Sequence, residues 1–198
     1  MLFDLGGVLV DVDQSRIFEG LARKTGFEAN KIKDTLLGAI PLNTDFIVKE
    51  YLPSQLTKEV NRALGSELSE IDVVTAVNAE LGETIHTTAT LLPELRPRVR
   101  IGCLSNTNSI HWDRLLSEYS FMHQFDRRFA SQLVGHAKPG REIYQVAADR
   151  LGVRPHQILF FDDKEENVRA AELLGWHAAV YRDHVGLIST LRDFGVLP

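Results

Sequence analysis

Four short segments of the chain combine acidic, hydroxyl, amide and basic side chains with glycine. They hold Asp4, Gly6 and Gly7, then Ser105 and Asn106, then Lys138, and finally Asp162 and Asp163. Two carboxylates held about 4 Å apart repel by roughly 4 kcal/mol at an effective dielectric constant near 20. If the segments meet, one lysine offsets only part of the repulsion among three carboxylates. The cluster therefore predicts a bound divalent cation with oxygen ligands, for which Mg²⁺ is suited.

The same side chains suit the transfer of a phosphoryl group. A nucleophile must approach a phosphorus atom screened by anionic oxygens, and the charge on those oxygens needs a cation and positioned donors. Asp4 can act as the nucleophile and form an aspartyl phosphate. Ser105 and Asn106 can donate hydrogen bonds to the phosphoryl oxygens, and Lys138 can screen both the phosphate and the nucleophile.

Five short apolar runs predict buried strands that end at or shortly before these segments. The runs cover residues 1–5, 99–104, 128–130, 157–161 and 177–181. Helical patterns over 109–118, 141–151 and 165–174 separate the later runs, and glycine follows the last two helices. This alternation predicts an α/β fold with a doubly wound parallel sheet of Rossmann-like type. Ligands bind such sheets at the carboxyl ends of the strands.

The segment after the first strand departs from that alternation. Helix formers dominate it, glycines punctuate it, and no strand of comparable quality appears in it. Helices are expected over 15–25, 29–37, 44–51, 53–64, 69–81 and near 84–95. We therefore predict an all-α cap domain at 14–95, inserted into an α/β core domain formed by 1–13 and 96–198.

Composition excludes several classes of protein. The 198 residues are 44% hydrophobic, and 22 Lys and Arg against 27 Asp and Glu give a net charge of -5, so a nucleic-acid partner is not expected. No run is long enough to span a membrane, and Asp4 interrupts the apolar start where a signal peptide would be unbroken. The single Cys103 lies in an apolar run and suits a reducing compartment. The predicted location is the cytoplasm, and the predicted partner is a small phosphorylated metabolite.

The four segments, in this order, resemble the four motifs of the haloacid dehalogenase-like (HAD) hydrolase superfamily. The separation of 101 positions between Asp4 and Ser105 leaves room for the helical cap of the C1 class. The runs FDLGGVLVD at 3–11, LSNTN at 104–108 and FDD at 161–163 are further similar to a bacterial subgroup that includes phosphatases of α-D-glucose 1-phosphate. The resemblance covers nearly the whole chain.

The resemblance implies a role for each motif residue. The implied roles are nucleophile and metal ligand for Asp4, backbone metal ligand for the carbonyl of Gly6, phosphate-binding hydroxyl for Ser105, motif lysine for Lys138, and acidic metal site for Asp162 and Asp163. The implied activity is that of a Mg²⁺-dependent phosphatase of small phosphorylated metabolites, in particular sugar phosphates, working through a phosphoaspartate on Asp4.

One position departs from the family pattern. Where Gly6 stands, phosphatases of the superfamily usually carry a second Asp that protonates the leaving group, and loss of such help costs about 10²- to 10⁴-fold in rate. We therefore expect a preference for leaving groups that need little protonation, such as an anomeric sugar oxygen or a phenolate. Asp11 or Asp13 folding back into the site is an alternative source of the proton.

Three other functions are compatible with parts of the pattern. A haloacid dehalogenase attacks carbon with the same aspartate and needs no metal, but adjacent Asp162 and Asp163 argue against metal-free chemistry. A pseudo-phosphatase that binds phosphorylated ligands without turnover is supported by Gly6. A receiver domain of two-component signalling carries its acid pair near the start of the chain, whereas here the pair comes late.

Overall fold

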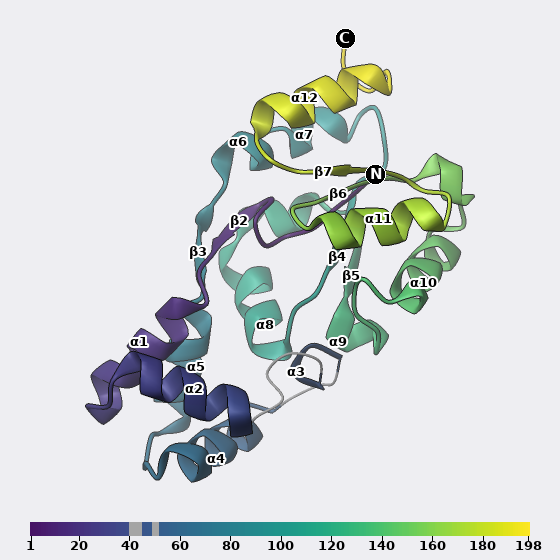
Figure 1. The fold of residues 1–198 in the computed structure, drawn as a ribbon. Helices are drawn as coiled ribbons and strands as arrows, with labels where there is room; N and C mark the ends of the chain where they lie inside the picture. Colours follow the sequence, from purple (N-terminus) through teal and green to yellow (C-terminus); the bar gives the residue numbers. More distant parts are fainter. Residues whose placement is uncertain (40–44, 49–51) are drawn as a thin grey trace.

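The computed structural model describes residues 1–39, 45–48 and 52–198. Its main sheet has five parallel strands in the order β5-β4-β1-β6-β7 (Figure 1). The strands are β1 (Leu2–Phe3), β4 (Gly102–Ser105), β5 (Arg127–Ala130), β6 (Leu159–Asp162) and β7 (His177–Val180). The chain runs outward from β1 to one edge through β4 and to the other through β6. The predicted α/β class and parallel sheet are confirmed.

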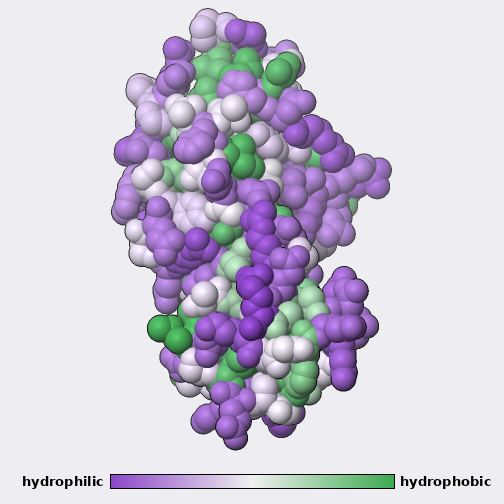
Figure 2. Space-filling view, turned by 90° about the vertical axis from the view of Figure 1, so that its left-hand side faces the viewer, coloured by the Kyte–Doolittle hydropathy of each residue, from purple (hydrophilic) through white to green (hydrophobic). Residues whose placement is uncertain are grey.

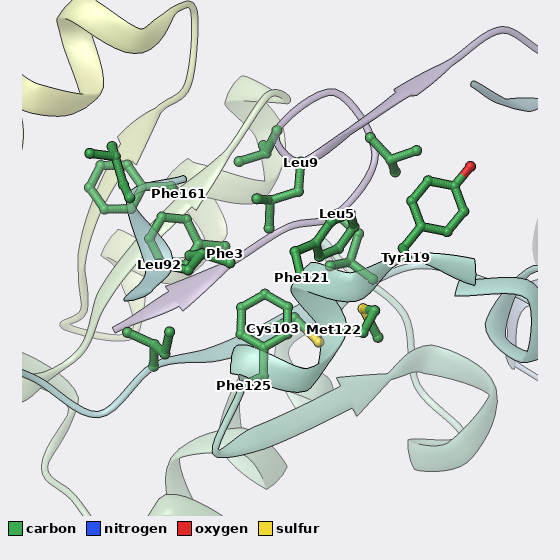
Figure 3. Close-up of a cluster of buried hydrophobic side chains, with 14 of the residues drawn as sticks. Phe3, Leu5, Leu9, Leu92, Cys103, Tyr119, Phe121, Met122, Phe125 and Phe161 are labelled. Carbon is green, nitrogen blue, oxygen red and sulfur yellow. The ribbon is translucent and has the colours of Figure 1, made fainter. Parts of the chain in front are cut away.

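Helices cover both faces of this sheet because neighbouring side chains of each buried strand point to opposite sides. Leu2 and Phe160 pack in one cluster with side chains of α10 (Arg141–Leu151) and α11 (Glu165–Leu173). Phe3 and Phe161 pack on the opposite face, with rings 5.4 Å apart (Figure 3). That second cluster is completed by side chains of α7 (Leu92–Leu95), α8 (Ser109–Glu118), η1 (Ser120–Gln124) and α12 (His184–Asp193).

A helical cap projects from the carboxyl edge of the sheet (Figure 1). Its helices are α1 (Ser15–Thr25), α2 (Ala29–Ala39), α4 (Pro53–Leu64) and α5 (Glu70–Asn78), and they pack around a separate apolar cluster. The short α3 (Asp45–Val48) contacts α9 (Ser131–Val134) of the core. The prediction of a helix over 44–51 is met by α3, and its other positions lie outside the described residues.

The predicted helices at the end of the cap are wrong in part. Residues of β3 (Leu81–Thr84) pair antiparallel with β2 (Val10–Val12), so a two-stranded ribbon joins cap and core. Two short helices, α6 (His86–Ala89) and α7, replace the helix expected near 84–95. A partner strand available only in the folded chain overrides the local helical pattern.

The end of the cap differs from the predicted domain boundary at residue 95. Leu91, Leu92 and Leu95 are buried in the core cluster that contains Phe3, not in the cap cluster. We propose that the cap ends near residue 80, where α5 gives way to β3. Among the described residues, no helix combines the length and the apolarity needed to cross a membrane.

Candidate active site

Asp4 lies directly after β1, at the carboxyl edge of the sheet, and is 7% exposed. Its Oδ1 accepts a hydrogen bond of 2.7 Å from the backbone N–H of Leu5, and the hydroxyl of Ser105 donates to the same carboxylate. Burial raises the pKa of Asp4 to about 6, against the opposing charge of Lys138. Asp4 is therefore mostly ionised at neutral pH, as an attacking carboxylate requires.

Lys138 is buried and joins two of the acids. Its Nζ lies 3.0 Å from Oδ1 of Asp4 and 2.6 Å from Oδ2 of Asp162, and it donates a third hydrogen bond of 2.8 Å to the carbonyl of Leu104. Burial alone would lower the pKa of Lys138, but the carboxylates of Asp4 and Asp162 outweigh it and raise the pKa. The site thus contains a fixed cation between two fixed anions.

Asp162, the last residue of β6, is fully buried and held at both oxygens. Besides Lys138 on Oδ2, its Oδ1 accepts hydrogen bonds of 2.9 Å from the backbone N–H of Lys164 and from Nδ2 of Asn167. These contacts fix the carboxylate at the carboxyl edge of the sheet. The side-chain oxygen of Asn167, Oδ1, is buried and has no hydrogen-bond partner among the described residues.

The three acids fit a divalent cation. Asp4, Asp162 and Asp163 offer oxygen atoms that all lie within 4.8 Å of one another. Burial raises the pKa of Asp163, and the charge of Asp162 adds to this. Lys138 leaves part of the negative charge uncompensated, and carboxylate oxygens are the ligands that Mg²⁺ prefers. The donor set and its excess negative charge are both suited to the predicted metal.

Gly7 is the glycine that this cluster requires. It has a φ of 71°, in the left-handed region, and a Cβ placed on it would lie 2.6 Å from Oδ2 of Asp163. Gly6 has no positive φ, and a Cβ there would meet Cγ1 of Val12 at 3.3 Å. The close approach to the Asp163 carboxylate and the positive φ both explain why glycine stands at position 7.

Ser105 is the last residue of β4 and Asn106 follows it, and both line the same pocket as Asp4. The Asn106 side chain, however, is engaged with the backbone of Lys138. Its Oδ1 accepts from the Lys138 N–H at 2.8 Å, and its Nδ2 donates to the Lys138 carbonyl at 2.8 Å. The predicted donation from Asn106 to a phosphate is therefore corrected for the side chain, which instead positions Lys138.

Neither alternative acid suggested by the sequence lines the described pocket. Asp11 forms an ion pair of 2.9 Å with Arg16 on the surface. Asp13 accepts hydrogen bonds from the backbone N–H and the hydroxyl of Ser15, which lower the pKa of Asp13. A carboxyl group held in its ionised form in this way is a poor proton donor.

Glu80 is a site residue that the sequence did not reveal. It follows α5 and lines, with Asp4, Ser105 and Lys138, a pocket of about 150 Å³ at the carboxyl edge of the sheet. Burial raises the pKa of Glu80, against the charge of Lys164. No local motif marks this residue, because only the packing of the cap brings it above the core.

The chain is similar in sequence to proteins named as phosphatases and in structure to a solved HAD family enzyme. It is 29% identical to "Phosphatase MT3486" of Mycobacterium tuberculosis over all of this chain and 95% of that one. It is 25% identical to D-ribitol-5-phosphate phosphatase of Bacteroides thetaiotaomicron, over 89% of this chain and 88% of that one. The structure of HAD family enzyme BT-2542 from Bacteroides thetaiotaomicron, in complex with magnesium and inorganic phosphate, matches with a TM-score of 0.79 and 28% identity, over 91% of this chain and 92% of that one.

A family model of haloacid dehalogenase-like hydrolases matches residues 1–175. The match includes all four motif segments and the whole cap. The order of the motifs, the parallel sheet and the family match agree, and the chain belongs to the haloacid dehalogenase-like hydrolases.

Proposed function

We propose that this hydrolase is a Mg²⁺-dependent phosphatase of small phosphorylated metabolites, acting through a phosphoaspartate on Asp4. The observation that carries the proposal is the cluster of Asp4, Asp162 and Asp163, whose oxygens lie within 4.8 Å of one another, with Lys138 between two of them. Metal-free attack on carbon gains nothing from such a cluster, which speaks against the dehalogenase alternative.

The metal would be held by Asp4, the carbonyl of Gly6, Asp162 and Asp163. When bound, Mg²⁺ supplies positive charge that offsets the repulsion among the acids and stabilises charge on the phosphoryl oxygens. Asp163 is the freer of the two late acids, because both oxygens of Asp162 are already hydrogen-bonded. Asp162 acts chiefly by fixing Lys138.

The protein residues then divide the reaction between them. A carboxylate oxygen of Asp4 bonds to phosphorus while the bond from phosphorus to the leaving oxygen breaks. The hydroxyl of Ser105, the backbone N–H of Asn106 and the ammonium of Lys138 bind the phosphoryl oxygens. Water subsequently attacks the phosphorus of the aspartyl phosphate, releasing inorganic phosphate and restoring Asp4.

Glu80 takes the role of the acid that is missing at Gly6. Glu80 lines the pocket that contains Asp4, and its Oε2 lies 3.7 Å from Nε2 of His111. The charge of Lys164 opposes the rise in the pKa of Glu80, and the charge of Asp13 adds to it. Because burial raises the pKa of Glu80, a larger fraction of the group carries a proton near neutrality than for an exposed glutamate. It is placed to protonate the leaving oxygen.

The test is phosphate release from a panel of phosphomonoesters, with and without Mg²⁺, by the wild type and by Asp4→Asn. We expect release that needs Mg²⁺, is abolished by a chelator and is lost in the variant. Ligand-dependent thermal shifts without turnover would instead favour the pseudo-phosphatase, and halide release insensitive to chelation would favour the dehalogenase. Sugar phosphates and a cytoplasmic location stay predictions from the sequence.

A further inference from the structure

A second pocket, of about 340 Å³, lies inside the cap. Apolar side chains of four cap helices enclose most of it, among them Phe18 and Leu21 of α1, Leu36 of α2, Leu56 and Val60 of α4 and Val73 of α5. Each of these six side chains is buried. Figure 2 shows hydrophilic and apolar residues mixed on one face of the cap, whereas these six lining side chains are turned inward.

The cap pocket adjoins the pocket of about 150 Å³ beside Asp4, which is the catalytic pocket. Five residues line both: Glu80, Asn106, Thr107, His111 and Lys164. A phosphoryl group beside Asp4 therefore has its ester oxygen near this shared rim. The remainder of the substrate must extend from the rim into the cap pocket.

The polar groups of the cap pocket gather at that rim and are largely engaged. Oδ1 of Asn108 accepts a hydrogen bond from the backbone N–H of His111, and Nδ2 of Asn108 lies 3.0 Å from Nδ1 of the His111 ring. Nε2 of His111 lies 2.9 Å from the carbonyl of Val77. Asn108 and Gln14 are the polar residues of the described lining outside the rim. A polyhydroxylated sugar in this space would leave buried hydroxyls without partners, which is costly.

We propose that the cap pocket receives an apolar group, so that the preferred substrate is a phosphate monoester of an aliphatic or aromatic alcohol and not a sugar phosphate. The inference rests on the proposed phosphatase activity for its turnover test. A volume of about 340 Å³ is at the lower end of the range for small-molecule sites, which are mostly apolar with a few placed polar groups. Here the polar groups lie chiefly at the rim shared with the catalytic pocket.

The first experiment measures kcat/KM for ethyl, butyl, hexyl and octyl phosphate, phenyl phosphate and glucose 1-phosphate, below micellar concentrations and with Mg²⁺. Burial of each added methylene predicts a rise of about 4-fold in kcat/KM until the pocket is full. Glucose 1-phosphate should be a poorer substrate than hexyl phosphate. A flat response to chain length, or a preference for the sugar phosphate, would overturn the inference.

Variants separate the pocket from the chemistry. Val60→Phe fills the cap pocket and should lower the rates with hexyl and octyl phosphate while sparing ethyl phosphate. Ile71→Phe, on the exposed side of α5 with Ile71 74% exposed, is the matched control and should change neither rate. If Val60→Phe does not fold, Val73→Thr puts a hydroxyl of nearly the same volume into the pocket, and it should reduce the dependence on chain length. Equal rates in all variants would contradict the inference.

Binding separates this inference from the proposed function. Alkylphosphonates, which cannot be hydrolysed, should bind the wild-type protein with Mg²⁺ in calorimetry, with an affinity that rises by about 4-fold per methylene. If binding depends on the length of the alkyl chain but no monoester is hydrolysed, the proposed phosphatase activity is refuted and the apolar pocket is supported. If monoesters are hydrolysed but the affinity does not depend on alkyl chain length, the phosphatase activity is supported and the apolar pocket is refuted.

Discussion

The two pockets of this protein are held together by opposite means. In the catalytic pocket hydrogen bonds and ion pairs fix Asp4, Lys138 and Asp162, as Lys138 is fixed by the two carboxylates and by the carbonyl of Leu104. In the cap pocket the walls are fixed by apolar packing of helices, and hydrogen bonds occur chiefly at the rim. In the function that we propose, the charged catalytic pocket carries out the reaction and the apolar cap pocket selects the substrate.

The largest effect is expected from Lys138→Met. Removing the ammonium leaves two buried carboxylates without compensation, so we expect kcat to fall by about 10³-fold or more and the free energy of unfolding to fall by about 3–5 kcal/mol. Lys58→Met, on the exposed side of α4, is the control. A variant as active and as stable as the wild type would show that Lys138 is not needed to compensate the carboxylates, and would contradict the contrast drawn between the two pockets.

The same variant should show a characteristic pH dependence. The folded state already raises the pKa of Asp4 to about 6, so Asp4 favours folding less as pH rises from about 4 to about 6. Without Lys138 this pKa rises further and the loss extends to higher pH. Denaturant unfolding at about pH 5 and about pH 8 should therefore show the larger deficit at the higher pH. A deficit that grows towards low pH would contradict this interpretation.

Glu80→Gln changes a residue that lines both pockets and that we propose as the proton donor. We expect kcat/KM for alkyl phosphates to fall by about 10²-fold, because their leaving groups need a proton. The rate with p-nitrophenyl phosphate, whose leaving group needs none, should change little. In the wild type the rate with alkyl phosphates should decline as pH rises through the raised pKa of Glu80, and the variant should lack that decline. Equal losses on both substrates would indicate a structural role.

Asp163→Asn should weaken the binding of Mg²⁺ and leave the cap pocket unchanged. Loss of one carboxylate ligand is expected to raise the Kd for Mg²⁺ by about 10-fold or more, measured by the Mg²⁺ dependence of phosphate release and by calorimetry. Glu165→Gln, in the exposed first turn of α11, is the control. Unchanged Mg²⁺ affinity would remove Asp163 from the site.

The smallest effect is expected from Asp72→Asn in the cap. Asp72 caps the start of α5 with Ser69 and lies 2.7 Å from Nζ of Lys24 on α1, and these contacts lower the pKa of Asp72 to about 2. The stability they add is present above about pH 4 and is lost as pH falls towards about 2. The variant should therefore melt slightly earlier at neutral pH, with unchanged activity on ethyl phosphate. Thermal unfolding across this pH range checks the difference.

The sequence predicted the catalytic pocket better than the cap pocket for a physical reason. Strands buried on both faces leave continuous apolar runs, and the polar residues that end β1, β4 and β6 are visible beside those runs. The parallel topology then brings Asp4, Ser105 and Asp162 to one edge. Local pattern and long-range geometry agree there.

The cap pocket was not predicted, because helical patterns in a sequence do not show which helix faces pack against each other. Phe18 and Val60 give ordinary amphipathic helices in the sequence, and only their packing shows a pocket between them. Glu80 carries no motif and gains its place from the same packing. The strand β3 depends on a partner from β2, so it was not predicted, and its end residues Leu81 and Thr84 were assigned to helices.

The most direct test of the account is whether Asp4 becomes phosphorylated during turnover. Enzyme quenched in acid while it hydrolyses a phosphomonoester with Mg²⁺ should carry one phosphoryl group on the peptide that contains Asp4, detected by mass spectrometry. The Asp4→Asn variant should carry none and should release no phosphate. Turnover with the phosphoryl group on another residue, or wild-type rates in the variant, would contradict the central claim.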